Sequence, residues 1–133
     1  MNIIITGGAG FIGSNFIFHI LNTHLNYRII CVDKLTYAGH LSTLKSVMDN
    51  PNFRFVKADI SDREAIEQLF MEEKTDMVVN FAAESHVDRS IENPGIFLET
   101  NIMVRPFLWM YVVNLGLNVI IKCPPMKCMV ICH

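Results

Sequence analysis

The residues with the clearest chemical implication are the glycines of the stretch TGGAGFIG, residues 6–13. Gly8, Gly10 and Gly13 have the G-x-G-x-x-G spacing, and Gly7, Gly10 and Gly13 have the G-x-x-G-x-x-G spacing. A turn without Cβ atoms lets the backbone approach a pyrophosphate closely. The helix expected after the turn offers unpaired N–H groups and a positive dipole end to that anion. The stretch therefore predicts a dinucleotide site, and a purely structural glycine turn is the alternative.

Two aspartates lie where adenosine contacts are expected. Asp33 ends an apolar segment about twenty residues beyond the last glycine, a spacing at which a carboxylate accepts hydrogen bonds from the adenosine ribose. Because a carboxylate there disfavours the extra phosphate of NADP, we predict NAD as the cofactor. Asp59 follows a further apolar segment and has two equal interpretations, a contact to the adenine edge or a cap for the next helix.

An alternation of strands and helices must position these residues. Short β-branched runs predict strands, and apolar residues at helical spacing predict helices. Ser61 with Glu64 three residues later has the capping-box pattern of a helix start. The alternation predicts an α/β protein with a doubly wound parallel sheet that carries helices on both faces. The expected strands are residues 2–6, 27–33, 52–60 and 76–83, and the expected helices are residues 11–24 and 61–74.

Composition limits the function classes. The 133 residues suffice for one domain, and a net charge of −2 gives no electrostatic reason to expect nucleic acid or an anionic membrane as a partner. The first residues lack the pattern of a signal peptide, and Cys31 is the only cysteine before position 123, so we expect a cytoplasmic protein. Residues 104–133 contain no Asp or Glu. We therefore divide the chain into residues 1–103 and an aberrant tail, residues 104–133.

Four longer stretches resemble a known family. They are MNIIITGGAGFIGSNF, VDKLTYAGHL, FVKADISDRE and VNFAAESHVDRSIENPGIFLETNI. Together they resemble the bacterial dTDP-glucose 4,6-dehydratases of the extended short-chain dehydrogenase/reductase superfamily, over residues 1–103. The resemblance implies the first half of a Rossmann-like fold, a lyase that uses NAD and a dTDP-sugar substrate, and a homodimer in the parent family. In that family NAD takes a hydride from the sugar C4 and returns it to C6 after water is lost.

The resemblance also implies the site residues. The glycine turn with Phe11 and Ile12 would contact the pyrophosphate, the segment from Asp33 the ribose, and Asp59 with Ile60 the adenine. The segment from Phe81 would run along the cofactor, with Ser85 also touching the sugar nucleotide. The implied cofactor-binding residues are Gly7, Gly10, Phe11, Ile12, Gly13, Asp33, Lys34, Leu35, Thr36, Asp59, Ile60, Phe81, Ala82, Ala83, Glu84, Ser85 and Thr100.

No catalytic residue is implied. The family carries its acid and base groups in an S-T-D-E-V-Y-G segment and a later Y-x-x-x-K, and this chain contains neither. We therefore expect no dehydratase turnover and weak or no retention of NAD. Because the second half of the fold is not matched, we also expect the fourth strand to have an uncovered edge and the cofactor cleft to have one wall. The dimer of the parent family is not expected for this chain.

The tail has an explanation at the level of the gene. If one base was lost after the codon of Met103, synonymous codons for KCPPMKCMV, residues 122–130, read V-S-T-D-E-V-Y-G in the restored frame. The same rule upstream yields G-T-S-F-L-V-D-V-C-R-K-L-G-L-K-R-Y-H-Q, which matches the family. We therefore predict that residues 104–133 are translated out of frame.

Other readings of the tail remain open. Cys123, Cys128, Cys132 and His133 are close in sequence, but their C-x4-C-x3-C-H spacing differs from the C-x2-C pairs of structural zinc sites, and we predict no metal. The uncharged residues 106–121 are too short to span a membrane. The alternative function is a small nucleotide-binding or interaction module whose cysteine-rich tail binds metal or associates with a membrane.

Overall fold

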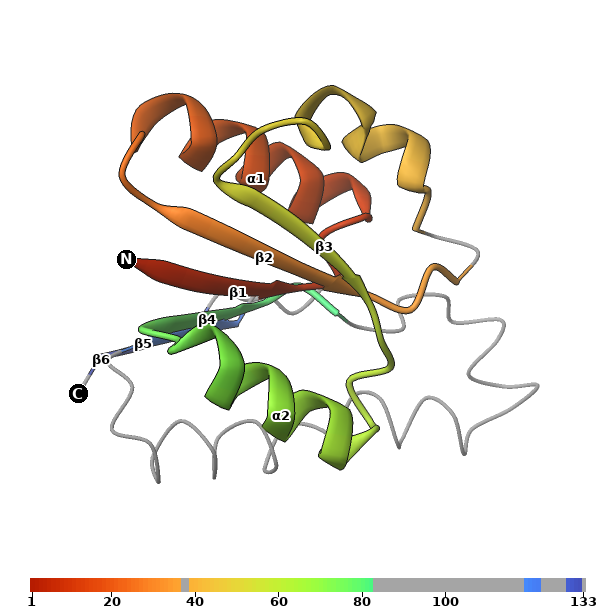
Figure 1. Cartoon of the computed structure of the whole chain (residues 1–133), viewed down its shortest axis with the longest axis vertical. Coiled ribbons are helices and arrows are strands. Elements are labelled where there is room, and N and C mark those ends of the chain that lie inside the picture. Colours follow the sequence, from red (N-terminus) through yellow and green to blue (C-terminus); the bar gives the residue numbers. More distant parts are fainter. Residues whose placement is uncertain (37–38, 83–118, 123–128, 133) are drawn as a thin grey trace.

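The chain forms an α/β fold around one twisted sheet (Figure 1). The computed structural model describes residues 1–36, 39–82, 119–122 and 129–132. Within these ranges six strands lie in the order β3-β2-β1-β4-β5-β6. The elements are β1 Asn2–Thr6, α1 Phe11–Thr23, β2 Arg28–Asp33, the 3-10 helix η1 Leu41–Val47, β3 Phe53–Lys57, α2 Arg63–Glu73, β4 Met77–Asn80, β5 Val119–Lys122 and β6 Met129–Cys132.

The first four strands are parallel, as the alternation of strands and helices predicts. β1 pairs with β2 on one side and with β4 on the other, and β2 also pairs with β3. The helices cover both faces, with α1 and η1 on one side of the sheet and α2 on the other (Figure 1). The predicted α/β class and parallel arrangement are therefore confirmed.

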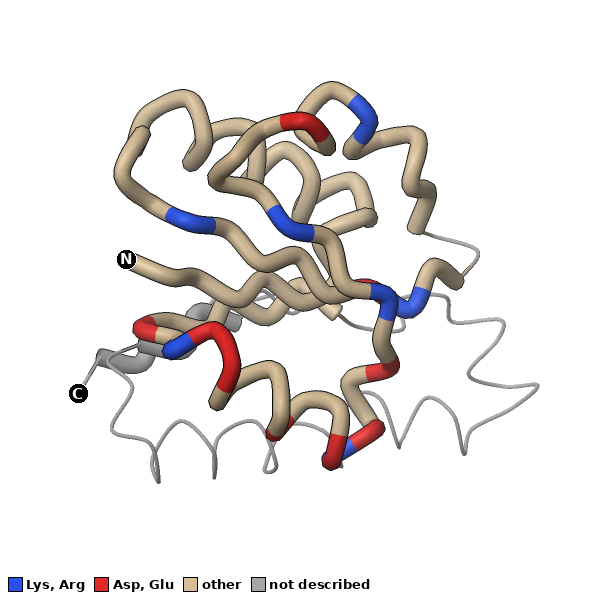
Figure 2. Tube along the Cα trace, in the orientation of Figure 1, with Lys and Arg blue, Asp and Glu red and all other residues tan. Residues whose placement is uncertain are grey.

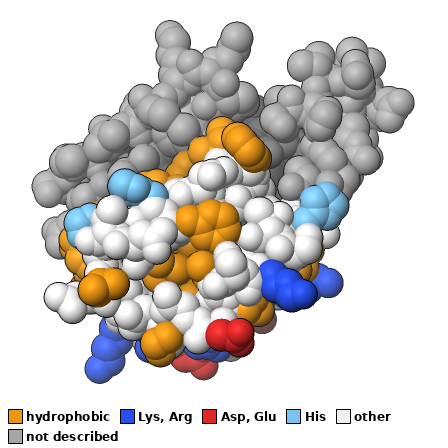
Figure 3. Space-filling model, turned by 90° about the horizontal axis from the view of Figure 1, so that it is seen from above, with side chains coloured by type: hydrophobic (Ala, Val, Ile, Leu, Met, Phe, Trp, Pro, Cys, Tyr) orange, Lys and Arg blue, Asp and Glu red, His pale blue; other side chains and the backbone are white. Residues whose placement is uncertain are grey.

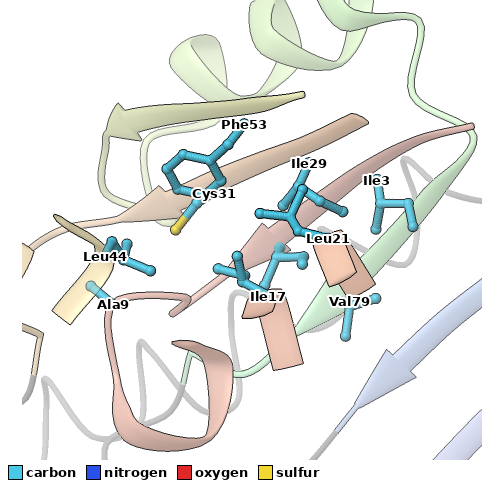
Figure 4. Packing of buried hydrophobic residues seen from close by; sticks show 10 residues of the cluster. Ile3, Ala9, Ile17, Leu21, Ile29, Cys31, Leu44, Phe53 and Val79 are labelled. Carbon is cyan, nitrogen blue, oxygen red and sulfur yellow. The ribbon is translucent and has the colours of Figure 1, made fainter. Parts of the chain in front are cut away.

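The sheet is apolar on both faces because helices cover both. Successive residues of a strand point to opposite faces, so Ile3 and Ile5 pack toward α1, whereas Ile4 packs toward α2. On the α1 face, Ile17 and Leu21 of the helix meet the strand residues shown in Figure 4. Two separate apolar layers thus fix β1, the strand that leads into the glycine turn. Hydrophobic side chains also reach the surface on the side that α1 and η1 cover (Figure 3).

The edge of β4 that faces away from β1 differs from the sequence expectation of an uncovered strand edge. β5 pairs in parallel with β4, with Val78 opposite Ile120, and β6 pairs antiparallel with β5. The expectation of an uncovered β4 edge is therefore wrong. The β-branched run of residues 119–121 satisfies the hydrogen-bonding groups of β4, whatever the origin of the tail.

Two local predictions also need correction. Helix α2 begins at Arg63 with Asp62 as its N-cap, whose Oδ1 accepts the N–H of Ala65 at 3.2 Å, so Ser61 is not the capping residue. The third and fourth strands end earlier than expected, at Lys57 and Asn80. Just beyond these ends, the N–H groups of Ala58 and Phe81 still donate to Asp33 O and Thr6 O, and the candidate site lies at this edge of the sheet.

Opposite charges join α2 to the sheet at the edge remote from that site. Figure 2 shows acidic residues along α2 and basic residues on the neighbouring strands. The buried carboxylate of Glu73 forms ion pairs with Arg28 of β2, at 3.1 Å, and with Arg54 of β3. The Glu73 side chain is 3% exposed, whereas both arginines are about half exposed and remain partly hydrated. In the described ranges no helix has the length and apolar character needed to cross a membrane.

Candidate functional site

The candidate site lies where the strand order reverses. β2 and β3 extend to one side of β1, and β4 lies on its other side, so the carboxyl ends of β1 and β4 border a crevice. Thr6 and Asn80 are register partners at these two ends. The Thr6 hydroxyl donates to Asn80 Oδ1 at 2.5 Å, and both residues are buried. In open α/β sheets this crevice is the usual place for a ligand.

The glycine turn begins directly after β1. Gly7 has φ +69°, a left-handed conformation that favours glycine. A Cβ at Gly7 would lie 2.5 Å from the backbone nitrogen of Ala82, which belongs to the segment after β4. A Cβ at Gly13 would lie 2.5 Å from Gly7 O. Gly7 and Gly13 are therefore required by close backbone contacts within the protein itself.

Gly10 has a different surrounding. Its φ of −76° suits any residue, and among the described residues a Cβ there would meet only Gly7 O, at 3.4 Å. It is the N-cap of α1, whose first turn has no side-chain cap and no acidic residue. The N-terminal N–H groups of a helix lack intrahelical acceptors, and Phe11 and Ile12 at this end are exposed. The open space and the donors fit an anionic group at this point.

Asp33 does more than the sequence predicts. Its Oδ2 accepts the N–H of Ala9 in the glycine turn at 2.9 Å, and its Oδ1 accepts the N–H of Leu35 at 2.8 Å. Leu35 has φ +57°, and this hydrogen bond supports its left-handed conformation. Each carboxylate oxygen keeps a second lone pair, which leaves acceptors for two hydroxyl groups. Asp33 therefore joins the glycine turn to the loop after β2 and still presents charge at the crevice.

Lys34 and Asp59 form an ion pair between the carboxyl ends of β2 and β3. Partial desolvation raises the pKa of Asp59, but hydrogen bonds from Lys34 and Ser61 outweigh this effect and lower the pKa below its usual value. Asp59 therefore stays ionised at neutral pH and is a hydrogen-bond acceptor. The helix-capping alternative for Asp59 does not hold for α2, which Asp62 caps.

The remaining predicted residues divide into three groups. Phe81 and Ala82 lie beside the glycine turn, and the Phe81 ring packs on Phe16 with 5.3 Å between ring centroids. The Ile60 side chain is buried in the α2 layer, so only its backbone remains for a ligand, whereas Thr36 is exposed. The predictions for Ala83, Glu84, Ser85 and Thr100 concern residues outside the described ranges.

The buried side chain of Cys31 packs against the glycine turn at Gly8. A Cβ at Gly8 would lie 2.5 Å from its sulfur, which points into the apolar layer in Figure 4. Burial and the nearby charge of Asp33 raise the pKa of the Cys31 thiol to about 12. The thiol is therefore protonated and acts as a small core residue. An apolar residue inside a strand gives no sequence signal for this role.

The described ranges contain no group of three or more residues that suits a metal ion. Of the cysteine cluster in the tail, Cys123, Cys128 and His133 lie outside those ranges. The segment 106–121 also lies mostly outside them, and its last three residues belong to β5.

Comparison with known proteins decides the family. A family model described as GDP-mannose 4,6 dehydratase matches residues 4–118. The chain belongs to this family. A dTDP-glucose 4,6-dehydratase from Xanthomonas campestris pv. campestris is 50% identical over 100 residues, which cover 75% of this chain and 28% of that protein. The chain thus spans about a quarter to a third of the length of such relatives.

Solved structures show the same fold. A dTDP-glucose 4,6-dehydratase from Bacillus anthracis in complex with NAD has a TM-score of 0.81 at 40% identity and matches 92% of this chain and 36% of its own. The enzyme of the same name from Streptomyces venezuelae, with NAD bound, has a TM-score of 0.80 at 39% identity and matches 88% and 37%. The resemblance found in the sequence is confirmed.

Proposed function

We propose that this chain is the NAD-binding portion of a dTDP-glucose 4,6-dehydratase, an enzyme that converts dTDP-glucose to dTDP-4-keto-6-deoxyglucose and water. The observation that carries the proposal is the glycine turn held by Asp33 at the reversal of strand order. A structural turn alone requires Gly7 and Gly13 but gives no reason for the open, uncapped helix start at Gly10. NAD supplies the hydride acceptor and donor in such a reaction, and the chain supplies the binding and orientation.

The pyrophosphate would bind at Gly10, Phe11, Ile12 and Gly13, where the helix start offers N–H groups and no Cβ fills the space. Phe11 and Ile12 are exposed at this helix start. Neither side chain is needed for the core. Backbone donors of this kind bind the anion with little reorganisation because the helix already fixes them.

The adenosine would bind on the other side of the turn. Asp33 would accept hydrogen bonds from the ribose, together with the loop of Lys34, Leu35 and Thr36, and Asp59 would accept one from the adenine amino group. The Lys34 charge is compensated by Asp59, so the carboxylate of Asp33 dominates the ribose position and opposes a 2′-phosphate. The segment from Phe81 to Ser85 and Thr100 would follow the nicotinamide half, with Ser85 also at the sugar nucleotide.

We further propose that residues 104–133 are an out-of-frame tail and that this chain has no dehydratase turnover. The absence of Asp and Glu from the tail supports the first statement, and the lack of the Thr-Asp-Glu and Tyr-x-x-x-Lys motifs supports the second. Sequencing the gene tests the tail, because one inserted base after the Met103 codon must restore the dehydratase frame. Formation of a 4-keto-6-deoxy sugar by the isolated chain would contradict the second statement.

Binding is tested by titrating the ¹⁵N-labelled chain with ADP-ribose, NAD and NADP and following amide chemical shifts. We expect saturable shifts at the helix start and at residues 33–36 with ADP-ribose and NAD. The affinity should be weak, with a Kd of about 1 mM, or −4 kcal/mol, and NADP should bind at least about tenfold more weakly, a difference of about 1.4 kcal/mol. No saturable shift with NAD or ADP-ribose would refute the proposal.

A further inference from the structure

We propose that β6, Met129–Cys132, is the surface through which this chain pairs with a second copy of itself, strand against strand and antiparallel. The contact is made by backbone groups, so its occupant is an extended strand rather than a small molecule. The inference goes beyond the proposed function, because β6 contributes no residue to the NAD site. It holds whether or not NAD binds.

The sheet has two outermost strands, β3 and β6 (Figure 1). Within the described ranges each of them pairs with one neighbour, β3 with β2 and β6 with β5. The outward N–H and C=O groups of an outermost strand form a template for a strand of another chain. Residue types at each edge therefore decide which of the two strands associates.

β3 carries charges that oppose association. Arg54 and Lys57 of this strand are exposed, and Arg54 forms an ion pair with Glu73 of α2. An antiparallel pairing of β3 with its own copy places Arg54 and the same residue of the copy on one face, near the axis between the strands. Like charges on paired strands are destabilising, and charged residues are a common protection of sheet edges. We therefore expect no association through β3.

β6 has no such protection. It reads MVIC and contains neither a charged residue nor a proline. Its two central residues, Val130 and Ile131, are β-branched and favour an extended, paired backbone. An uncharged and β-branched edge strand is the pattern of a site where chains associate. The charge difference between the two edges thus selects β6.

Symmetry limits how two copies of β6 can pair. Residues directly opposite each other in an antiparallel pair point to the same face of the sheet, and successive residues alternate between faces. A two-fold axis between identical strands must therefore pass between one residue and the same residue of the copy. The largest overlap of Met129–Cys132 with itself places this axis at Val130 or at Ile131.

The same symmetry predicts a closed assembly. Val130 and Ile131 are uncharged, so neither residue repels its own copy at the axis. An isologous contact uses the same surface on both chains and is complete when two chains are joined. Since β3 at the opposite end of the sheet is charged, no second edge remains to extend the assembly into a fibre. The product is a dimer.

The first test uses the full chain under reducing conditions. A contact between strands of four residues buries little area, so we expect weak association, with a Kd between about 10 µM and 1 mM in sedimentation velocity. Amide chemical shifts of the ¹⁵N-labelled chain should change with protein concentration at residues 129–132. The amides of residues 53–57 should not change.

The second test introduces a charge into β6. In Ile131→Lys the new charge lies close to its own copy across the axis, and the Kd of the dimer should rise at least about tenfold. Lysine is a common residue of edge strands, so the pairing of β6 with β5 should persist. Met71→Lys is the matched control, because it adds the same charge at a residue of α2 that is 71% exposed. Its Kd should equal that of the wild type.

A cross-link tests the register without disturbing the charge. The three cysteines of the tail are changed to serine, which leaves the buried Cys31 as the remaining natural cysteine. Val130→Cys or Ile131→Cys is then added, and the chain is oxidised with oxidised glutathione. The residue at the axis faces its own copy and should form a disulfide-linked dimer, whereas Met71→Cys in the same background should not.

The results either support or refute the inference. A wild-type chain that stays monomeric at about 1 mM would show that β6 does not associate. Concentration-dependent shifts at residues 53–57 in place of 129–132 would assign the contact to the wrong edge. Species that grow beyond a dimer, or a failure of both cysteine variants of β6 to cross-link, would contradict the two-fold pairing.

Discussion

Gly7 and Gly10 belong to the same motif but should respond to alanine in opposite ways. In Gly7→Ala the new Cβ meets the backbone of Ala82 at 2.5 Å and of Phe81 at 2.7 Å. The backbone of Phe81 and Ala82 is held by hydrogen bonds to Thr6 O and Asn80 Oδ1, so it has little freedom to move away from the new Cβ. The residue also sits at φ +69°, which disfavours any side chain. The first effect costs about 1–3 kcal/mol and the second about 1–2 kcal/mol.

The net change in the free energy of unfolding follows from these terms. Alanine reduces the entropy of the unfolded chain, which restores about 0.4–1 kcal/mol. Gly7→Ala should therefore destabilise the protein by about 3 kcal/mol, a large part of the 5–15 kcal/mol of an ordinary domain. For a chain of this size the melting temperature should fall by about 10 °C.

Gly10→Ala is the matched control. Its φ of −76° accepts alanine, and within the part of the chain that the structure describes the nearest atom to the new Cβ, Gly7 O, lies 3.4 Å away. The entropy gain and the weaker N-cap preference of alanine nearly cancel, so stability should change by less than about 0.5 kcal/mol. The Cβ instead occupies the space proposed for the pyrophosphate. ADP-ribose affinity should therefore fall at least about tenfold, which is 1.4 kcal/mol.

The assay is urea unfolding of both variants and the wild type by circular dichroism, together with ADP-ribose titration. A change in midpoint with an unchanged slope reports stability alone. If Gly7→Ala stays within about 0.5 kcal/mol of the wild type, the close contact with residues 81–82 does not limit the turn. If Gly10→Ala keeps the ADP-ribose affinity of the wild type, the pyrophosphate does not approach at that position.

Three further results are expected. Glu73→Gln should destabilise the chain by about 1–2 kcal/mol, less than for a fully buried ion pair because both arginine partners are half exposed, and 1 M salt should reduce the difference in urea unfolding. The pKa of Asp59 is lower in the folded protein than the unfolded value of 3.8, so its ionised carboxylate stabilises the fold at neutral pH. This stabilisation is lost as the pH falls from 3.8 through the lower folded value. The free energies of unfolding of the wild type and Asp59→Asn should therefore converge only in acid. With the other three cysteines changed to serine, Cys31 should react with a disulfide reagent at pH 8 only after unfolding, because the pKa of its buried thiol is about 12, and fast reaction of the native chain would contradict its placement.

Local patterns in the sequence were sufficient for the first four strands and for the position of the glycine turn. Residues 2–6 are rich in β-branched side chains and end at glycines, and the next strand ends at Asp33, about twenty residues beyond Gly13. Periodicity and spacing are therefore enough to predict that part of the site. The start of α2 was placed too early because Ser61 and Asp62 are both good capping residues. The sequence does not distinguish the two residues, and only the backbone conformation in the structure shows that Asp62 is the N-cap of α2.

Other features depend on contacts between residues far apart in the chain. The pairing of β5 with β4 joins segments about forty residues apart, and short apolar runs do not name their partners. The two hydrogen bonds of Asp33 depend on where Ala9 and Leu35 lie, and the Lys34–Asp59 ion pair depends on the adjacency of β2 and β3. Each of these interactions forms only because the fold brings its two partners close together, which the sequence alone does not show.

The sequence by itself determined the glycine motif, the acidic residue at the end of the second strand and the alternation that makes the sheet parallel, because these depend on residue type and local spacing. The tertiary structure decided what holds the site in place. Asn80 is an ordinary residue at a strand end until β4 lies beside β1, and only then does its side chain meet Thr6 and Ala82. Hydrogen bonds act over about 3 Å, so a role that rests on them exists only once the fold has brought their partners together.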